Sequence, residues 1–161
     1  MQTEVVLSLG GNKGDREMLL SKAIEAIKIH FQLVRVSEVY ETSAWGGVAK
    51  GNFLNQVVVV LTEKQPEEVL GIIQGIESQL GRKRDEHWGD RTMDIDILYF
   101  GERKINTSLL QIPHPYIAQR EFVLVPLAAI LPQKVNPVTG KNSLEMLAEG
   151  EDLSEVKVFK R

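Results

Sequence analysis

The sequence predicts an α+β fold: a ferredoxin-like βαββαβ core with a mainly antiparallel sheet, helices packed on it, and additional C-terminal elements. Three observations predict it. Short β-branched and apolar runs alternate with two stretches in which apolar residues recur at steps of three and four. Over about the first hundred residues, these segments follow the split βαβ order. With 161 residues, 43% of them hydrophobic, the chain is expected to form one domain, residues 1–161, with its own core.

A glycine-rich turn is predicted between the first strand and the first helix. The apolar run at residues 5–9 predicts the strand, and residues 10–15, with three glycines and a final aspartate, predict a turn and a capped helix start. The helix has one apolar face, and the opposite face is charged. Its apolar positions are Leu20, Ala23, Ile24, Ile27 and Phe31. We interpret this helix as scaffold.

Two strands, a helix and a further strand follow. Residues 33–42 have a period of two and predict one strand, and residues 53–62 contain four consecutive valines, which is typical of a central strand covered on both faces. The glycine-rich stretch between them predicts a hairpin with a mobile lid. Pro66 and Gly81 bound a second amphipathic helix, and residues 93–100 alternate as another strand.

The remaining residues predict additions to this core. Residues 105–112 carry only a weak pattern, and prolines at positions 115, 132 and 137 separate a tail of short helices. Residues 143–147 give the clearest of these helices, and residues 156–159 predict a last strand.

Composition excludes several classes of function. A formal charge of −3 gives no surface-wide positive field for nucleic acid or acidic lipid, so any anion site must be local. The absence of cysteine excludes disulfides, thiolate metal sites and cysteine nucleophiles. No apolar run has the length of a membrane span, and the first residues lack a signal-peptide pattern. We therefore expect a cytoplasmic protein that binds neither nucleic acid nor membrane.

Two aspartates are the strongest candidates for chemistry. On a strand, Asp94 and Asp96 point to the same face with Cα atoms about 6 to 7 Å apart, while Ile95 and Ile97 point to the core. Paired carboxylates repel each other, and a divalent cation such as Mg²⁺ between them keeps both ionised. The alternative is an edge strand with one solvated face.

The polar segment before these aspartates predicts a phosphate site. Arg82, Arg84 and Arg91 carry guanidinium groups, which bind phosphate through paired hydrogen bonds, so three of them beside a metal site indicate a polyphosphate clamp. Trp88 is interpreted as a core anchor of this segment or as part of a lid. A solvated charged loop is the alternative. Residues 10–14 lack the spacing and the Lys-Ser/Thr ending of a Walker A motif.

Two smaller clusters accompany these segments. Prolines on both sides stiffen His114, and Arg120 follows six residues on, so both are placed to face one pocket. Phe53 and Asn55 share a strand face and offer an aromatic plane beside an amide. The alternatives are a structural histidine, a phenylalanine in the core and an asparagine at a strand end.

In their order along the chain, these motifs resemble the 6-hydroxymethyl-7,8-dihydropterin pyrophosphokinase family of folate biosynthesis. The resemblance covers nearly the whole chain and rests on Gly10-x-Asn12-x-Gly14-Asp15, Tyr40-Glu41-Thr42, Phe53-Leu54-Asn55, Arg82-x-Arg84, Trp88-Gly89-x-Arg91-Thr92-x-Asp94-Ile95-Asp96-Ile97, Pro113-His114-Pro115 and Arg120-x-Phe122-Val123-Leu124-x-Pro126-Leu127. It implies transfer of the β,γ-pyrophosphoryl group of ATP to the hydroxymethyl oxygen of the pterin, with release of AMP, by a monomer.

The resemblance also implies the role of each candidate residue. Asp94 and Asp96 would hold two Mg²⁺ ions, one between the α- and β-phosphates and on the substrate hydroxyl, the other between the β- and γ-phosphates. Together with Arg82, Arg84 and Arg91 they form the implied catalytic set. The implied ATP-binding residues are Gln74, Glu77, Arg82, Arg84, Trp88, Arg91, Ile97, Ile112, His114 and Arg120. The implied pterin-binding residues are Thr42, Ser43, Trp45, Phe53, Asn55, Asp94 and Phe122, with the two phenylalanines stacking on the heterocycle.

The position of Gln74 and Glu77, three residues apart, places both on the expected polar side of the second helix. Three positions depart from the family pattern: Asp90 replaces a frequent proline, Tyr116 replaces a frequent arginine, and Ser43-Ala44 replaces a segment that often contains proline.

Two other classes of function remain as alternatives. A ferredoxin-like module could bind RNA, a nucleotide or a metabolite without catalysis, although the acidic charge and the lack of an aromatic strand motif count against RNA. A nucleotide-sugar transferase could use the Asp-x-Asp pair, but such enzymes usually need a larger sheet than this length allows.

Overall fold

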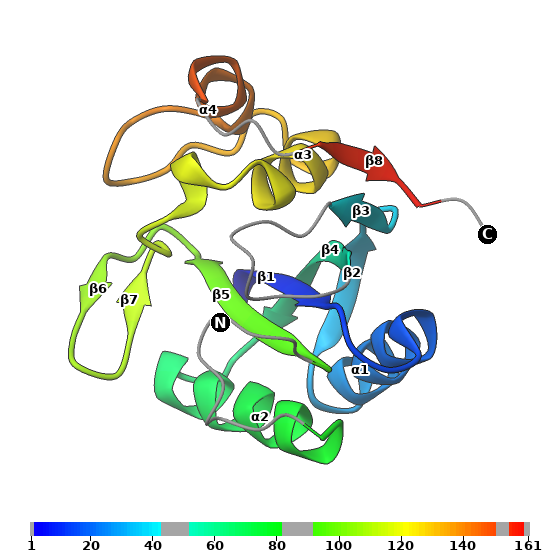
Figure 1. The fold of residues 1–161 in the computed structure, drawn as a ribbon. Coiled ribbons are helices and arrows are strands. Elements are labelled where there is room, and N and C mark those ends of the chain that lie inside the picture. The colour runs from blue at the N-terminus through cyan, green and yellow to red at the C-terminus, as the bar shows by residue number, and fades with distance from the viewer. Residues whose placement is uncertain (1, 43–51, 82–91, 151–154, 160–161) are drawn as a thin grey trace.

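The computed structural model describes residues 2–42, 52–81, 92–150 and 155–159 of the chain. These residues form a six-stranded sheet between two layers of helices, with α1 and α2 on one face and α3 and α4 on the other (Figure 1). The helices are α1 (Arg16–His30), α2 (Pro66–Gln79), α3 (Glu121–Ile130) and α4 (Ser143–Glu149). The predicted α+β class is confirmed.

The sheet is antiparallel throughout its described pairings, in the strand order β5-β1-β4-β3-β8, and β2 pairs with the other end of β4. Its strands are β1 (Thr3–Gly11), β2 (Gln32–Val36), β3 (Tyr40–Thr42), β4 (Phe53–Thr62), β5 (Asp94–Phe100) and β8 (Val156–Val158). The βαββαβ order, the hairpin pairing of β3 with β4 and the last strand are therefore confirmed. The valine-rich strand β4 lies between β1 and the strands β2 and β3.

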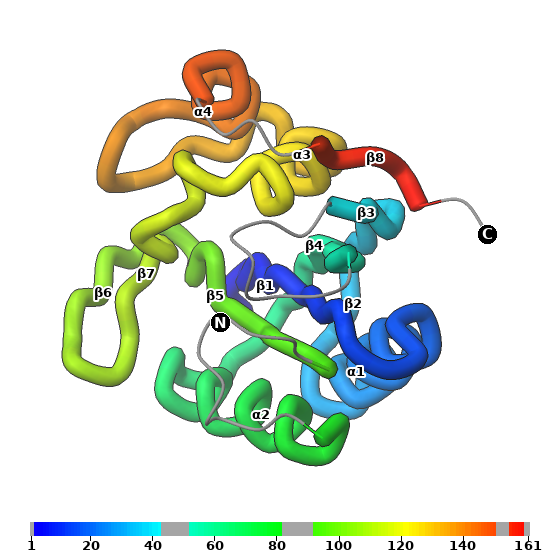
Figure 2. Tube along the Cα trace, in the orientation of Figure 1, coloured from blue at the N-terminus to red at the C-terminus, as the bar shows by residue number. Residues whose placement is uncertain are grey.

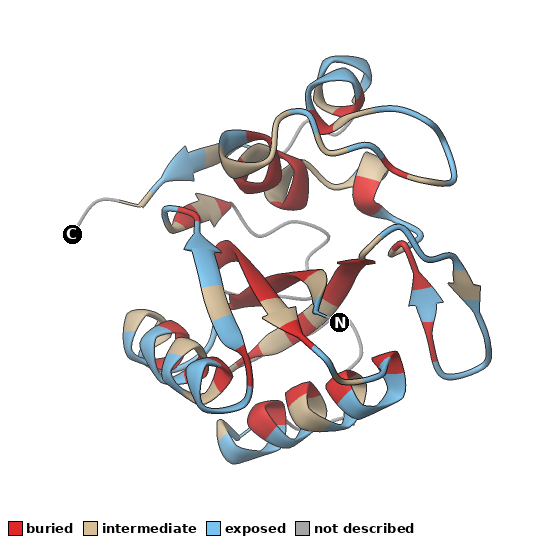
Figure 3. Cartoon of the chain, turned by 180° about the vertical axis from the view of Figure 1, so that it is seen from behind, coloured by how far each residue is buried: buried red, intermediate tan, exposed pale blue. Residues whose placement is uncertain are grey.

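Each face of the sheet has its own core. Alternate residues of β1, β4 and β5 pack against α1 and α2 on one side, and the intervening residues pack against α3 and α4 on the other. Figure 3 shows buried residues concentrated in β1, β4 and β5, while β2 is largely exposed. Because both faces of β4 are covered, its hydrophobic run needs no alternation.

Local signals set the helix boundaries as expected. The Asp15 carboxylate accepts a hydrogen bond from the Met18 backbone N–H at 3.2 Å and caps α1. Pro66 occupies the start of α2, where its missing N–H costs nothing. After α2, Gly81 has φ +88°, a left-handed conformation that favours glycine and ends the helix.

Three segments differ from the prediction. Residues 10 and 11 belong to β1 and not to a turn, because both pair with β4. The predicted strand at 33–42 divides into β2 and β3. At Ser37, the backbone N–H still donates to the Val57 carbonyl at 2.9 Å, but the side-chain hydroxyl takes the place of a backbone carbonyl and accepts from the Val57 N–H at 2.9 Å. Residues 105–112 contain a small hairpin of β6 (Ile105–Asn106) and β7 (Gln111–Ile112), which extends from the main sheet beside β5 (Figure 2).

Among the described helices, none combines the length and the apolar character that crossing a bilayer requires.

Replacing Leu54 by alanine is expected to lower the free energy of unfolding by about 2 to 5 kcal/mol, because its side chain is fully buried and truncation leaves a cavity between β4 and the helices. Urea denaturation followed by circular dichroism measures this. Ile29→Ala, at a position of α1 that is 79% exposed, is the control and is expected to change stability by less than about 0.5 kcal/mol. Equal effects of the two substitutions would contradict the assigned core.

Candidate active site

Three neighbouring strands bring the main candidate residues into one row. In the sheet register, Gly10 of β1 pairs with Asp94 of β5 on one side and with Asn55 of β4 on the other. At a strand spacing of about 4.8 Å, the Asp94 and Asn55 backbones lie roughly 10 Å apart. In the next row, Ser8 lies between Asp96 and Val57. The sheet register thus brings the predicted metal ligands close to a predicted pterin contact.

The two aspartates point as the sequence predicts. Ile95 and Ile97, 4% and 6% exposed, belong to the core under α1 and α2, so alternation turns Asp94 and Asp96 to the opposite face. The Asp96 side chain keeps 35% of its surface accessible. Solvent and small ligands can therefore reach the carboxylate from the face that α3 covers further along the sheet.

His114 is fixed beside this pair by backbone contacts. Its N–H donates to the Leu98 carbonyl at 3.0 Å, which holds the segment after β7 against β5. Its ring Nδ1 accepts a hydrogen bond from the Tyr116 N–H at 3.1 Å, so the neutral ring carries its proton on Nε2. That Nε2 atom lies 3.9 Å from Asp96 Oδ2. The histidine thus presents a donor toward the carboxylate site.

Burial keeps this histidine neutral. Desolvation, and next the charge of Arg120, lower the pKa of His114 to about 4 against the opposing charge of Asp94. At neutral pH the ring therefore acts as a hydrogen-bond donor through Nε2–H and not as a cation.

Arg120 lies against two aromatic rings immediately before α3. Its Cζ atom is 5.2 Å from the ring centroid of Tyr116 and 5.7 Å from that of Phe122, both within the range of cation–π contacts. Tyr116, where the resemblance leads us to expect arginine, thus provides a ring for a neighbouring arginine.

A cavity of about 360 Å³ opens beside β5, α2 and β7. Apolar side chains from α2, β5 and β7 form part of its walls, and polar groups come from Asp96, His114 and the β6–β7 hairpin. Its described lining is Leu70, Ile73, Ile95, Asp96, Ile97, Thr107, Ser108, Leu109, Leu110, Gln111, Ile112, His114, Pro115 and Tyr116. Apolar surfaces for a flat base beside polar groups for its phosphates suit a nucleotide. Three predicted ATP contacts, Ile97, Ile112 and His114, therefore meet at one cavity.

The predicted pterin contacts on β3 and β4 are also adjacent. Asn55 is 4% exposed, and its Nδ2 donates to Thr42 Oγ1 at 3.5 Å. Phe53 is half-buried and lies on the same face of β4 as Asn55. Phe122 is half-buried in the first turn of α3, a helix that packs on β3 and β4. The two phenylalanines thus come from elements that face each other.

Gly10 is a candidate site residue that the sequence analysis missed. A Cβ atom at this position would lie 2.3 Å from Asn55 Oδ1 and 3.3 Å from the Leu54 carbonyl oxygen, so only glycine leaves room for the amide. The signal was a glycine directly after an apolar strand, which was interpreted as a turn.

The expected position of Glu77 on the polar side of its helix is wrong. Glu77 is 5% exposed and faces β5, where its Oε2 accepts a hydrogen bond from the Ile95 N–H at 2.7 Å. The spacing of three residues was compatible with a solvated face, but α2 packs with that position toward the sheet. Gln74 is half-buried on the same helix. Among the described residues, neither Gln74 nor Glu77 lines the cavity beside Asp96.

Several predicted residues lie outside the described part of the chain. These are Ser43, Trp45, Arg82, Arg84, Trp88 and Arg91, together with the departures at Ala44 and Asp90.

The donor set at β5 fits magnesium bound together with a phosphorylated ligand. Within the described residues, no cluster of three or more histidine, aspartate or glutamate side chains could hold a metal by itself. Two carboxylates on one strand face are nevertheless the protein ligands that Mg²⁺ commonly uses when phosphates and water complete its octahedral shell.

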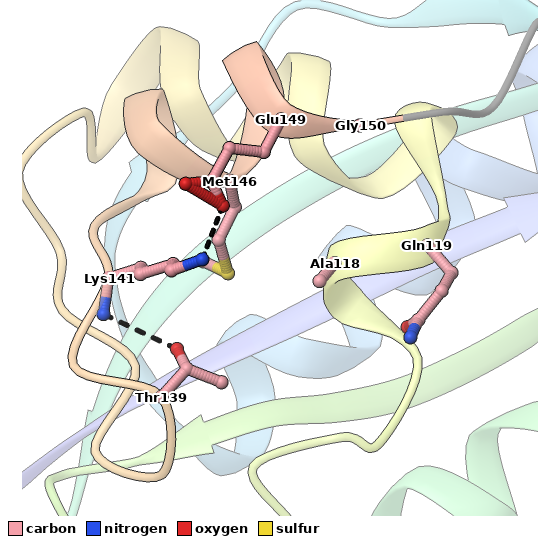
Figure 4. Close-up of a pocket in the computed structure, with 7 residues that line it drawn as sticks. All are labelled: Ala118, Gln119, Thr139, Lys141, Met146, Glu149 and Gly150. Carbon is pink, nitrogen blue, oxygen red and sulfur yellow. Dashed lines mark hydrogen bonds and ion pairs between the residues drawn. The ribbon is translucent and has the colours of Figure 1, made fainter.

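A second cavity, of about 380 Å³, lies between the short helix η1 (Ile117–Gln119) and α4 (Figure 4). Its lining includes an ion pair between Lys141 and Glu149, and the Lys141 N–H donates to Thr139 Oγ1 at 3.3 Å. It shares no lining residue with the cavity beside Asp96 and contains none of the predicted site residues.

Known proteins are similar to this chain over most of its length. The profile of the family described as 7,8-dihydro-6-hydroxymethylpterin-pyrophosphokinase (HPPK) matches residues 6–132. The chain is 41% identical over 145 residues to the 2-amino-4-hydroxy-6-hydroxymethyldihydropteridine pyrophosphokinase of Aquifex aeolicus, covering 90% of this chain and 91% of that protein. It is 42% identical over 135 residues to the protein of the same name from Bacillus subtilis, covering 83% and 81%.

Solved structures share the fold. Wild-type Plasmodium falciparum HPPK-DHPS with STZ-DHP superposes with a TM-score of 0.73 at 17% identity over 92% of this chain. The chain spans only 43% of that longer protein. From the profile match and the two bacterial relatives, the chain belongs to the 7,8-dihydro-6-hydroxymethylpterin-pyrophosphokinase family.

Proposed function

We propose that this protein transfers the β,γ-pyrophosphoryl group of ATP to the hydroxymethyl oxygen of 6-hydroxymethyl-7,8-dihydropterin in folate biosynthesis. The products are AMP and 6-hydroxymethyl-7,8-dihydropterin diphosphate. The observation that carries the proposal is the row in which Gly10 lies between Asp94 and Asn55, near a cavity that Asp96 and His114 line. A carboxylate pair between a nucleotide cavity and an amide suits transfer between two bound substrates.

ATP is proposed to occupy the cavity beside β5. Ile97 and Ile112 would contact the adenine and ribose, and His114 and Arg120 would contact the phosphates. Arg82, Arg84, Trp88 and Arg91 are proposed to complete the phosphate site, and Gln74 stays a predicted nucleotide contact. The neutral His114 supports this placement, because its Nε2–H can donate to a phosphate oxygen near Asp96.

Asp94 and Asp96 are proposed to hold two Mg²⁺ ions. When bound, such ions would polarise the phosphate oxygens and offset the negative charge that shifts toward AMP.

The pterin is proposed to stack between Phe53 and Phe122. Asn55 and Thr42, with Ser43 and Trp45, would bind its polar edge, because an amide can both donate to and accept from a heterocycle rich in donors and acceptors. This placement directs the hydroxymethyl group along the row toward Asp94.

In the reaction, the hydroxymethyl oxygen forms a bond to the β-phosphorus, and the bond between that phosphorus and the bridging oxygen of AMP breaks. His114, whose pKa burial lowers to about 4, would donate a hydrogen bond to phosphate. The hydroxyl proton would leave to solvent or to a phosphate oxygen. The protein therefore acts mainly through positioning and electrostatic stabilisation.

Omission of one substrate at a time tests this proposal. ATP consumption is expected only when the pterin and Mg²⁺ are both present. ATP consumption that does not depend on the pterin would contradict transfer to this acceptor. Binding of both substrates by folded protein without any turnover would favour a binding module.

Gly10→Ala is expected to raise the KM for the pterin by roughly 10-fold or more, because the new methyl group displaces the Asn55 amide and removes its hydrogen bonds to the substrate. Steady-state kinetics at saturating ATP measures this change, and the KM for ATP should shift much less. Gly75→Ala is the matched control, since a Cβ there meets no atom within 4 Å. An unchanged pterin KM would show that the Asn55 amide does not depend on Gly10.

We also propose that residues 1–161 act as a single-domain monomer in the cytoplasm, without binding nucleic acid or membrane. The acidic net charge of −3 supports the lack of nucleic-acid binding. Sedimentation equilibrium tests the monomer against its mass of 18.1 kDa.

A further inference from the structure

We propose that Glu77 is a positioning residue that acts through the backbone of β5: its buried carboxylate fixes the peptide between Asp94 and Ile95 and so sets how the two aspartates meet the metal ions. This inference rests on the proposed function, since it assigns a purpose to the side chain behind the proposed metal ligands.

The contact is short and shielded from water. Glu77 Oε2 accepts the hydrogen bond of the Ile95 N–H at 2.7 Å, and the residue is only 5% exposed. Around it, Ile73 and Ile76 of α2 pack in the same core as Ile95. A hydrogen bond to a carboxylate is stronger than one to a neutral acceptor, and a low-dielectric surrounding strengthens it further.

The position of β5 in the sheet explains why an acceptor is needed there. Within the described part of the chain, β1 is the one strand that pairs with β5, so no described strand pairs with the other edge of β5. In an antiparallel pair, successive residues direct their N–H groups alternately toward and away from the neighbour. The Ile95 N–H points away from β1 to α2, where Glu77 replaces the missing strand. Without it, a buried N–H would lack an acceptor.

This peptide lies between the two carboxylates. Asp94 and Asp96 flank Ile95 and pair with Gly10 and Ser8 of β1 on the inner edge of β5. Fixing the intervening peptide from the outer edge therefore limits rotation of the backbone that carries both side chains. Groups that orient metal ligands from behind commonly alter metal affinity or activity by about 10- to 100-fold when they are removed.

The position of the carboxylate also separates this role from direct contact with ATP. Glu77 bonds to the backbone of β5, and among the described residues it does not line the cavity beside Asp96. A role through geometry requires the length of the side chain and an acceptor oxygen. A role through charge requires the carboxylate itself.

Two variants separate these roles. Glu77→Gln keeps the length and an acceptor oxygen but loses the charge, whereas Glu77→Asp keeps the charge but is shorter by one methylene and no longer reaches the Ile95 N–H. The matched control is Ile76→Val, which removes one methyl group from the same side of α2 without touching that hydrogen bond.

For each folded variant, electron paramagnetic resonance measures the affinity for Mn²⁺ in the presence of α,β-methylene-ATP. Hydrogen exchange of the Ile95 amide is followed by NMR. Glu77→Asp is expected to weaken Mn²⁺ binding by about 10- to 100-fold and to speed exchange at Ile95. The Mn²⁺ affinities of Glu77→Gln and Ile76→Val are expected to stay within about 3-fold of the wild-type affinity, a smaller change than in Glu77→Asp.

Three results would overturn the inference. Weaker Mn²⁺ binding in Glu77→Gln than in Glu77→Asp would assign the carboxylate a role through charge. Wild-type Mn²⁺ affinity in Glu77→Asp, with fast Ile95 exchange, would show that the hydrogen bond does not affect the metal site, while the proposed function stands. Absence of Mn²⁺ binding by the wild-type protein would remove the proposed metal site itself.

Discussion

Asp94→Ala and Asp96→Ala are each expected to lower kcat by roughly 10³-fold or more, because a metal ion on transferring phosphates supplies several kcal/mol of transition-state stabilisation. Both side chains point to the face opposite the core under α1 and α2, so their loss should leave the fold intact. Initial rates at saturating ATP and pterin measure kcat, and circular dichroism checks folding.

Glu102→Ala is the control for these aspartates, since it removes an exposed carboxylate from the turn that follows β5. It should leave kcat nearly unchanged. A near-normal kcat in either aspartate variant would contradict the assignment of the metal ligands.

The second large expected effect is the loss of turnover in Arg82→Ala and Arg84→Ala. Each is expected to lower kcat by roughly 10²- to 10³-fold, because guanidinium groups that bind transferring phosphates stabilise charge in the transition state. Pterin affinity, measured by titration, should change only a few-fold. Both residues lie outside the described part of the chain, so this prediction rests on the sequence motif.

Arg103→Ala is the matched control, since this exposed arginine follows β5 and stacks on Phe100, 5.8 Å from the ring centroid. Its kcat should remain close to that of the wild-type protein. A loss confined to pterin affinity in the Arg82 or Arg84 variants would contradict a role in phosphate transfer.

Regular patterns made the core of the fold predictable. The strand at residues 53–62 and the two long helices follow from apolar spacing and from helix-start signals, the cap at Asp15 and the proline at position 66. The strand alternation that turns Asp94 and Asp96 away from Ile95 is equally local. Because strand alternation depends only on neighbouring residues, the sequence alone indicates that the two carboxylates share one face.

Tertiary pairing decided the parts that were not predictable. Gly10 lies in a glycine-rich segment that is typical of a turn. Because it pairs with β4 on one side and β5 on the other, β1 continues through it. The break between β2 and β3 depends on the contact of Ser37 with Val57, twenty residues away. Local spacing carries no information about such partners.

Glu77 shows the same limit within the site. A glutamate on an amphipathic helix is usually solvated, and only the packing of α2 against β5 turns it to the Ile95 N–H. The family resemblance marked the residue as relevant to ATP, whereas the geometry gives it a contact with the strand that carries the aspartates.

The most direct test of pyrophosphoryl transfer is the identity of the nucleotide product. Purified protein is incubated with ATP, Mg²⁺ and 6-hydroxymethyl-7,8-dihydropterin, and the nucleotides are separated by chromatography. The account predicts AMP, formed in equal amount with pterin diphosphate and only when the pterin is present. Formation of ADP would show transfer of a single phosphoryl group and would contradict the proposed reaction.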